Sequence, residues 1–268
     1  MRLTIITVVY NELESLKLTI DSVVKHLDED VEYWIIDGSS NTEINSYLED
    51  LDHPNIKWVS EPDEGLYHAM NKGIDRATGD FLIFMNAGDV FHVEFSFDKA
   101  LLGNDVNNSV LLGYSIEVYG EDKYLRPGLG REDDVFNSPS HQATFYPRSF
   151  YSKNKYQLHR PIGGDAYYTA EAIVQCGALF VPLIICEFAL GGISSSYNIA
   201  SIKLRIRQID SKSYVMRLII KAVIWRCLPQ SLFYRVLALK KYTRFSNTTL
   251  PNLYKNTISY PRDSSDIN

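Results

Sequence analysis

The sequence has few cysteines and no long apolar run. Its three cysteines, Cys176, Cys186 and Cys227, show no Cys-x-x-Cys spacing and are too few for a disulfide framework, so we expect three small buried side chains in a reducing compartment. No segment reaches the roughly 20 consecutive apolar residues that a membrane-spanning helix needs, so no transmembrane helix is predicted. The apolar run from Leu3 to Tyr10 leads into a polar turn without a small-residue cleavage site. We therefore expect a first strand rather than a secretory signal, and a cytoplasmic protein.

The turn after this predicted strand also lacks glycine. It reads Tyr10-Asn11-Glu12, whereas a dinucleotide-binding turn reads Gly-x-Gly-x-x-Gly and cradles a pyrophosphate. This difference disfavours a nicotinamide-dependent oxidoreductase. A nucleotidyltransferase would need a basic, glycine-rich loop at the same place, so it remains only a less favoured alternative.

Charge is distributed unevenly along the chain. The net charge is −6 over 268 residues, yet residues 203–244 contain eleven Lys and Arg and a single acid, Asp210. A basic tail thus follows an acidic body, which is typical of a segment that binds an anionic surface. With 45% hydrophobic residues overall, the chain can bury a sizeable core in one large domain or two small ones.

The first 92 residues alternate between strand and helix patterns. Apolar runs predict strands at 2–9, 31–36, 56–59 and 81–85, and helical periodicity predicts helices at 13–27, 41–51 and 66–74. This alternation predicts an α/β fold with a doubly wound, mostly parallel, Rossmann-like central sheet. Ligands of such sheets bind at the carboxyl ends of the strands.

After residue 92 the pattern indicates a small mixed sheet followed by a helical tail. Strands are expected at 110–119, where apolar and polar residues alternate, at 123–126 in a hairpin, at 141–146, and at 179–190 with a break at Pro182. Residues 127–139 and 191–196 are expected to be loops and 165–176 a helix. The tail is expected to form amphipathic helices at 215–228 and 230–241, and residues 246–268 a loosely held end.

One stretch, Ser60 to Asp89, carries the densest set of motif residues. It contains Asp63-Glu64-Gly65-Leu66-Tyr67-His68-Ala69-Met70-Asn71-Lys72-Gly73-Ile74 and, after a turn, Phe84-Met85-Asn86-Ala87-Gly88-Asp89-Val90-Phe91. This order resembles the family-2 inverting glycosyltransferases of the GT-A fold, in particular the bacterial exopolysaccharide, colanic-acid and O-antigen branch. The resemblance extends over about the first 195 residues. In one departure, Asn86-Ala87-Gly88-Asp89 stands where the family metal motif reads Asp-x-Asp-Asp, so only the last carboxylate is present.

The resemblance implies transfer of a sugar from a UDP- or GDP-sugar to a saccharide acceptor on polyprenyl diphosphate, in surface polysaccharide or O-antigen synthesis. It implies a catalytic domain at 1–200, with a nucleotide-sugar-binding half at 1–92 and an acceptor half at 93–200, followed by a tail at 201–245 and an end at 246–268. The donor-binding positions that it implies are Tyr10, Asn11, Glu12, Asp37, Asp63, Asn71, Lys72, Asn86 and His141. Strand-end carboxylates can accept hydrogen bonds from a base or ribose, and a lysine can face the diphosphate as a point charge.

The resemblance also implies a metal ligand and a base. Asp89 is the metal-ligand candidate, because Mg²⁺ or Mn²⁺ needs only one or two protein carboxylates beside phosphate oxygens and water. Asp165, after two glycines at the start of a predicted helix, is implied as the general base, with Glu171 in reserve. Gly192 and Ser194 match the family's Gly-Gly-x-Ser loop, which can close over the diphosphate.

Each candidate also has a structural interpretation that the sequence leaves open. Asp89 and Asp37 can stabilise turns, and Glu12 can be an ordinary first-turn helix acid. The remaining alternatives are a helix N-cap for Asp165, solvated helix positions for Asn71 and Lys72, a structural histidine for His141 and a merely flexible loop at Gly192 and Ser194.

Two questions of function stay open at this stage. The tail at 203–244 is expected to lie on an anionic membrane surface, at the inner face of the plasma membrane, but its helices can instead pack on the catalytic domain or a second subunit. Nucleic acid is a weaker rival, because the tail is apolar between its charges. The loss of the first motif acid at Asn86 also suggests a catalytically silent protein that only binds a nucleotide sugar.

Overall fold

The computed structural model describes residues 1–51, 53–98, 106, 108–137, 139–160, 162–190, 202, 212–229, 232–233, 243–245 and 258–260. The Gly192 and Ser194 loop lies outside them, as does the predicted helix at 230–241 except for residues 232 and 233. Most of the predicted end at 246–268 is outside them as well.

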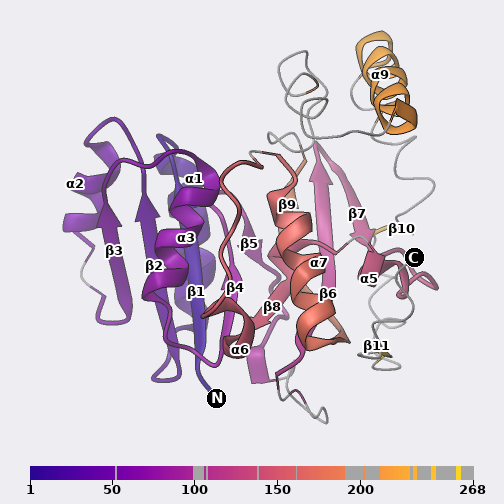
Figure 1. The fold of residues 1–268 in the computed structure, drawn as a ribbon. Coiled ribbons are helices and arrows are strands. Elements are labelled where there is room, and N and C mark those ends of the chain that lie inside the picture. Colours follow the sequence, from indigo (N-terminus) through magenta and orange to yellow (C-terminus); the bar gives the residue numbers. More distant parts are fainter. Residues whose placement is uncertain are drawn as a thin grey trace.

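The first part of the chain forms four parallel strands joined by helices (Figure 1). The elements are β1 (Leu3–Val9), α1 (Leu13–Val23), a 3₁₀ turn (Val24–His26), β2 (Val31–Asp37), α2 (Glu43–Glu49), β3 (Ile56–Ser60), α3 (Leu66–Arg76) and β4 (Phe81–Phe84). β1 pairs with β2 and β4, and β2 pairs with β3, all in parallel. The order β3-β2-β1-β4 therefore brings the carboxyl ends of these strands to one edge of the sheet.

The second part extends the same sheet with mixed pairing. Its elements are β5 (Val90–Phe91), β6 (Val110–Tyr119), β7 (Asp122–Arg126), α5 (Asp134–Asn137), a 3₁₀ turn (His141–Ala143), β8 (Thr144–Pro147), α6 (Arg148–Tyr151), α7 (Gly164–Cys176) and β9 (Ala178–Ala189). β8 lies antiparallel between β4 and β6, and β6 pairs in parallel with β9. Three further elements are α9 (Lys212–Cys227), β10 (Thr243–Arg244) and β11 (Ile258–Tyr260).

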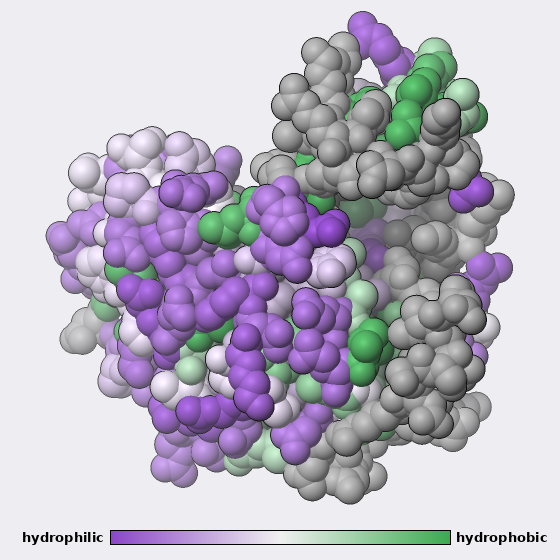
Figure 2. Space-filling model, in the orientation of Figure 1, coloured by the Kyte–Doolittle hydropathy of each residue, from purple (hydrophilic) through white to green (hydrophobic). Residues whose placement is uncertain are grey.

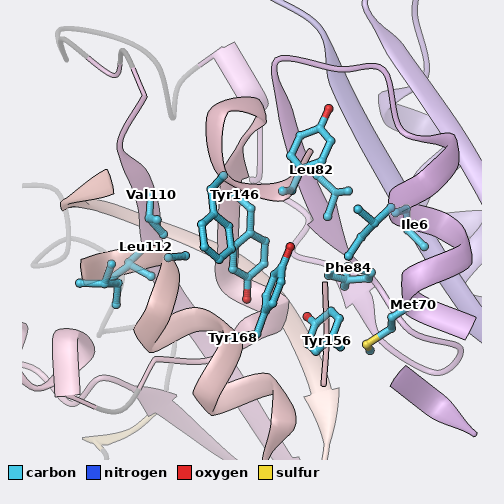
Figure 3. Close-up of a cluster of buried hydrophobic side chains, with 14 of the residues drawn as sticks. Ile6, Met70, Leu82, Phe84, Val110, Leu112, Tyr146, Tyr156 and Tyr168 are labelled. Atoms are coloured by element: carbon cyan, nitrogen blue, oxygen red, sulfur yellow. The ribbon is translucent and has the colours of Figure 1, made fainter. Parts of the chain in front are cut away.

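Buried side chains pack on both faces of this sheet. Alternate residues of β1 belong to different clusters: Ile6 and Val8 pack with α3 and α7, whereas Ile5 and Val9 pack with α1 and α2. Figure 3 shows part of the first cluster, in which Met70 of α3 lies near Phe84 of β4 and the ring of Tyr156. Helices on both faces of the parallel strands β1 to β4 confirm the predicted doubly wound α/β fold.

Three local predictions were wrong. The loop predicted at 127–139 contains α5, and the strand predicted to begin at His141 begins at Thr144, after a 3₁₀ turn. β9 continues through Pro182, because a register shift against β6 accommodates the irregularity. The strand predicted at 110–119 is confirmed as β6; it is buried on both faces, and its buried carboxylate, Glu117, is paired with the guanidinium of Arg126 at 2.7 Å.

The prediction of three buried cysteines is wrong for one of them. Cys227, on α9, is exposed, whereas Cys176 and Cys186 are buried as predicted. In the described part of the chain, no helix combines the length and the apolar character that crossing a bilayer requires.

Candidate active site

The turn that follows β4 is held rigidly at the edge of the sheet. The hydroxyl of Thr7 in β1 donates to the carbonyl of Met85 at 2.6 Å. Gly88 has a φ of +96°, which favours glycine, and its N–H donates to the carbonyl of Ser15 at 3.1 Å. These contacts fix the backbone of the Asn86 to Asp89 turn against β1 and α1.

Thr19 of α1 was not predicted as a site residue, yet it anchors the same turn. Its hydroxyl donates to the carbonyl of Asp89 at 2.8 Å and accepts from the N–H of Gly88 at 2.9 Å. No sequence signal distinguishes Thr19 from an ordinary threonine on an amphipathic helix. Its role becomes visible only when α1 is packed on the sheet.

Asp89 is a buried carboxylate with one oxygen left unpaired. Its side chain is 8% exposed, and among the described residues Oδ2 has no hydrogen-bond partner. Burial raises the pKa of Asp89 to about 7, although the charge of His141 and a hydrogen bond from Gln142 oppose this shift. The buried Oδ1 of Asn86 is also unpaired. Because buried oxygens are normally paired, two unpaired ones in the same turn suit a cation that they could coordinate.

His141 links this turn to α7. Its Nε2 lies 3.3 Å from the amide nitrogen of Asn86, and its Nδ1 lies 3.3 Å from Oδ2 of Asp165. The imidazole is largely buried, with 11% of its side chain exposed. His141 therefore connects the candidate metal turn and the candidate base through direct contacts.

Asp165 lies in the first turn of α7, and its carboxylate is held from both sides. Gly163 occupies the N-cap position, so Asp165 is not the N-cap. The hydroxyl of Tyr67 donates to Oδ1 at 3.0 Å, and His141 contacts Oδ2. Burial alone would raise the pKa of Asp165, but the hydrogen bond and charge of His141 and the hydrogen bond of Tyr67 hold it well below its usual range. The carboxylate is thus ionised.

A second group of candidates gathers where β1 and β2 end. Asn11, with a φ of 56°, donates from its backbone N–H to Ser39 Oγ at 2.8 Å and from its amide to Ser40 Oγ at 3.2 Å. Tyr10 and Glu12 beside it are exposed, and the Glu12 side chain makes no capping bond to α1. Asn11 therefore ties the turn after β1 to the loop after β2.

The two aspartates near this loop are both engaged. Asp37 is fully buried, and its carboxylate accepts from the N–H of Ser39 at 2.9 Å and from Ser60 Oγ at 2.7 Å. Asp63 caps the N–H of Gly65 at 2.8 Å and lies directly against Gly38, where an added Cβ would come within 1.8 Å of its Oδ2. Gly38 is required by this close approach.

The candidates on α3, Asn71 and Lys72, both bond to groups outside the His141 group. Lys72 donates to the carbonyl of Pro62 at 2.7 Å and pairs with Glu61 at 3.3 Å. Asn71 uses both ends of its amide on the backbone of Tyr156, at 2.8 and 2.9 Å. The reserve base Glu171 accepts from Gln175 at 3.1 Å, one turn along α7. Among the described residues, no three His, Cys, Asp or Glu side chains are grouped as a metal site.

A doubly wound sheet with carboxylates and amides gathered at its strand ends is the architecture of nucleotide-binding α/β enzymes. The family comparison makes this class specific. The model of glycosyl transferase family 2 matches residues 4–173, and the chain belongs to this family.

Relatives in mycobacteria support this assignment. An uncharacterized glycosyltransferase of Mycobacterium tuberculosis is 31% identical over 205 residues, which cover 72% of this chain and 76% of the relative. A PGL/p-HBAD biosynthesis glycosyltransferase of Mycobacterium bovis is 27% identical over 157 residues, which cover 55% of this chain and 60% of the relative. The chain is therefore similar to glycosyltransferases over more than half of its length.

Solved structures share the fold. TarS 1–349 of S. aureus in complex with UDP-GlcNAc has a TM-score of 0.59 at 14% identity, covering 81% of this chain and 69% of that chain. The mannosyltransferase PcManGT of Pyrobaculum calidifontis, in complex with GDP-Man and Mn²⁺, has a TM-score of 0.53 at 15% identity, covering 82% of this chain and 69% of that chain. This chain spans 42% of a longer TarS chain. The central architecture is thus that of GT-A glycosyltransferases.

Proposed function

We propose that this glycosyltransferase inverts the anomeric centre as it moves a sugar from a UDP- or GDP-sugar to a saccharide acceptor on a polyprenyl diphosphate. The observation that carries the proposal is the position of the Asp165 carboxylate, which lies between His141 and Tyr67 and is connected through His141 to the Asn86 to Asp89 turn. The complexes of structural neighbours with UDP, UDP-GlcNAc and GDP-Man support a nucleotide-sugar donor. We place the reaction in surface polysaccharide or O-antigen synthesis, following the motif resemblance.

In the reaction, an acceptor hydroxyl oxygen forms a bond to the anomeric carbon on the face opposite the diphosphate. The bond from that carbon to the diphosphate oxygen breaks, and its electron pair leaves with the diphosphate. The hydroxyl proton passes to a carboxylate oxygen of Asp165. Because the displacement is direct, no covalent sugar–enzyme intermediate forms and the configuration inverts.

Asp89 and Asn86 are the residues that would hold a divalent cation, Mg²⁺ or Mn²⁺, through their unpaired buried oxygens. When bound, the cation would neutralise charge on the departing diphosphate. The Mn²⁺ in the PcManGT complex supports this cofactor. The hydroxyl of Thr19 holds the backbone of this turn at Gly88 and Asp89.

The donor nucleoside would lie over residues 1–92, on Tyr10, Asn11, Glu12, Asp37 and Asp63. Lys72 donates to the carbonyl of Pro62, so it must break this hydrogen bond to bind the donor. Asn71 is bonded to the backbone of Tyr156, so a role for it in donor binding would be exerted through Tyr156. Residues 93–200 would supply the acceptor side through Asp165.

Turnover of UDP- and GDP-sugars with lipid-linked acceptors tests the proposal. Donor binding without turnover would favour the silent nucleotide-sugar-binding protein that Asn86 suggests.

Gly38→Ala is expected to weaken donor binding by roughly tenfold or more, because a methyl group at this position displaces the carboxylate of Asp63. Isothermal titration with UDP and GDP measures the effect. Gly120→Ala is the control, since no atom lies within 4 Å of an added Cβ there, although its φ of +59° strains the variant locally. Equal donor affinity in Gly38→Ala and the wild type would remove Asp63 from the donor site.

We also propose that α9 lies on an anionic membrane surface, at the inner face of the plasma membrane. Met216, Ile220 and Val223 recur on one face of the helix and are 59%, 51% and 56% exposed. Figure 2 shows hydrophobic residues gathered on α9 at the upper right of the molecule. By helical spacing, exposed cations border this face: Arg217 and Lys221 on one edge and Arg226 on the other. α9 contains no acidic residue, so its charge complements anionic lipid.

The full chain is expected to sediment with vesicles of anionic lipid and to be released by salt. Ile220→Glu combined with Val223→Glu should reduce the bound fraction by roughly tenfold, because it puts charge into the apolar face. Val93→Glu is the matched control, since Val93 is 89% exposed and lies outside α9. Unchanged vesicle binding by the double variant contradicts the proposal. Loss of a dimer in the same variant, without vesicle binding by the wild type, would assign the face to a second copy of the chain.

A further inference from the structure

Among the described residues of 1–92, Tyr67 is the one whose side chain forms hydrogen bonds with Asp165. It lies in the first turn of α3, 98 residues before Asp165 in the chain, and is 6% exposed. Its hydroxyl donates to Oδ1 of Asp165 at 3.0 Å and accepts from the N–H of Asp165 at 3.2 Å. The two bonds fix both the carboxylate and the backbone that carries it.

The ring of Tyr67 is held as firmly as its hydroxyl. It contacts the Cα of Gly164 so closely that an added Cβ would lie 2.8 Å from Cε2. It also stacks on Tyr156, with the ring centroids 5.1 Å apart and the planes 12° from parallel. Tyr67 therefore has little freedom to rotate, and its hydroxyl has a defined position.

A second set of contacts, through Tyr156, also connects α3 with α7; we call the two sets together the frame. Asn71, one turn after Tyr67 on α3, holds the backbone of Tyr156 with two hydrogen bonds. Tyr156 stacks in turn on Tyr168, with centroids 4.1 Å apart, and Tyr168 lies one turn after Asp165 on α7. The close-up in Figure 3 shows Tyr156 and Tyr168 beside one another. α3 and α7 are thus joined both at Asp165 and one turn further along.

The two carboxylate oxygens of Asp165 contact different side chains. His141 contacts Oδ2 and belongs to the acceptor half of the chain, whereas Tyr67 contacts Oδ1. Burial and the charge of Asp165 raise the pKa of the Tyr67 hydroxyl above its usual range, so it stays a hydrogen-bond donor. With both oxygens engaged, the plane of the carboxylate is set before any acceptor binds.

We propose that Tyr67 is a positioning residue for sugar transfer: its hydroxyl orients Asp165 toward the acceptor hydroxyl and couples the base to the helix that follows the donor-binding loop. The proposal rests on the proposed function, because it takes Asp165 as the base. It also gives Asn71 a role, which is to hold Tyr156 against the ring of Tyr67. Misplacing a catalytic group by about 1 Å can cost roughly 100-fold in rate, so a single hydroxyl can matter this much.

The test compares Tyr67→Phe with Tyr168→Phe in the full chain. Both remove one hydroxyl from the same aromatic stack, but that of Tyr168 donates to the carbonyl of Asn154 at 3.3 Å and not to Asp165. Tyr67→Phe is expected to lower kcat roughly 10- to 100-fold, with KM for donor and acceptor within about twofold. Tyr168→Phe should keep kcat within about twofold. Replacing Tyr67 by 4-aminophenylalanine, which restores a donor on the ring, should recover most of the rate.

A double variant separates positioning from an independent effect. If Tyr67 acts through Asp165, then Tyr67→Phe adds no further loss of kcat in an Asp165→Asn background. Additive losses, an unchanged kcat in Tyr67→Phe, or its unfolding while Tyr168→Phe stays folded would each overturn the proposal. If Asp165→Asn itself keeps full turnover, the assignment of the base fails, whereas a rate loss in Asp165→Asn alone leaves the base intact and removes only Tyr67.

Discussion

Asp89→Ala is expected to abolish sugar transfer and metal-dependent donor binding, with turnover reduced by roughly 10³-fold or more, while the domain stays folded. The loss follows because Asp89 is the surviving acid of the motif and its Oδ2 has no partner within the described residues. The fold should persist, since Thr19 and Gly88 hold the turn through its backbone rather than through the carboxylate. Removing the buried carboxyl group also removes the free-energy cost of its desolvation.

The measurement is donor binding by thermal shift, with Mn²⁺, with Mg²⁺ and with a chelator. A ligand that binds only the native state raises the melting temperature, so the wild type should respond to donor with metal and respond less after chelation. Asp89→Ala should respond equally with and without metal. Asp80→Ala is the matched control, because Asp80 precedes the opposite end of β4 and bonds to the N–H of Arg2. Wild-type turnover in Asp89→Ala would remove Asp89 from the site.

Asp165→Asn should keep donor affinity and lose at least about 100-fold in kcat. The amide has the shape of the carboxylate and can still contact Tyr67 and His141, so the frame around it should remain. Because the amide cannot accept the proton of the acceptor hydroxyl, only the chemical step should become slower. Donor titration and steady-state kinetics with a lipid-linked acceptor distinguish the two parameters.

Glu171→Gln provides the control for this substitution. Glu171 lies on the same helix, and its carboxylate accepts from Gln175 rather than from the His141 group. It should keep kcat within about twofold. A slow Glu171→Gln beside a fast Asp165→Asn would move the base one and a half turns along α7, and weaker donor affinity with intact kcat in Asp165→Asn would mark that residue as structural.

Much of the fold could be predicted because its signals are local. The strands β1 to β4 are short apolar runs, and α1 and α3 carry their apolar residues at helical spacing, so pattern alone placed them. The burial of β6 could not be predicted in the same way. Apolar and polar residues alternate along this strand, yet the polar residues Ser115 and Glu117 are buried, and Glu117 is paired with Arg126. The neutralising partner and the layers on both faces are tertiary features.

The candidate site divides along the same line. Asp89, Asn86, His141 and Asp165 were named from motif positions, but their mutual contacts were not, because a contact between Asn86 and His141 spans 55 residues of chain. Tyr67 belongs to the motif, but the sequence indicates no role for it. Nothing in the sequence marks Thr19 as a residue of the site. In the other direction, Asn71 matched a donor-binding position although both ends of its amide hold Tyr156. The donor-binding role of Asn71 stays a prediction.

The contact between Tyr67 and Gly164 limits how this enzyme can be recombined with its relatives. A chimera that takes residues 1–92 from this chain and the remainder from another member of the family inherits Tyr67 from one parent and the residue at position 164 from the other. Any parent with a side chain there would push against the ring, since even a Cβ comes within 2.8 Å of it. Exchanges intended to alter acceptor choice should therefore carry α3 together with the start of α7, as one unit of inheritance.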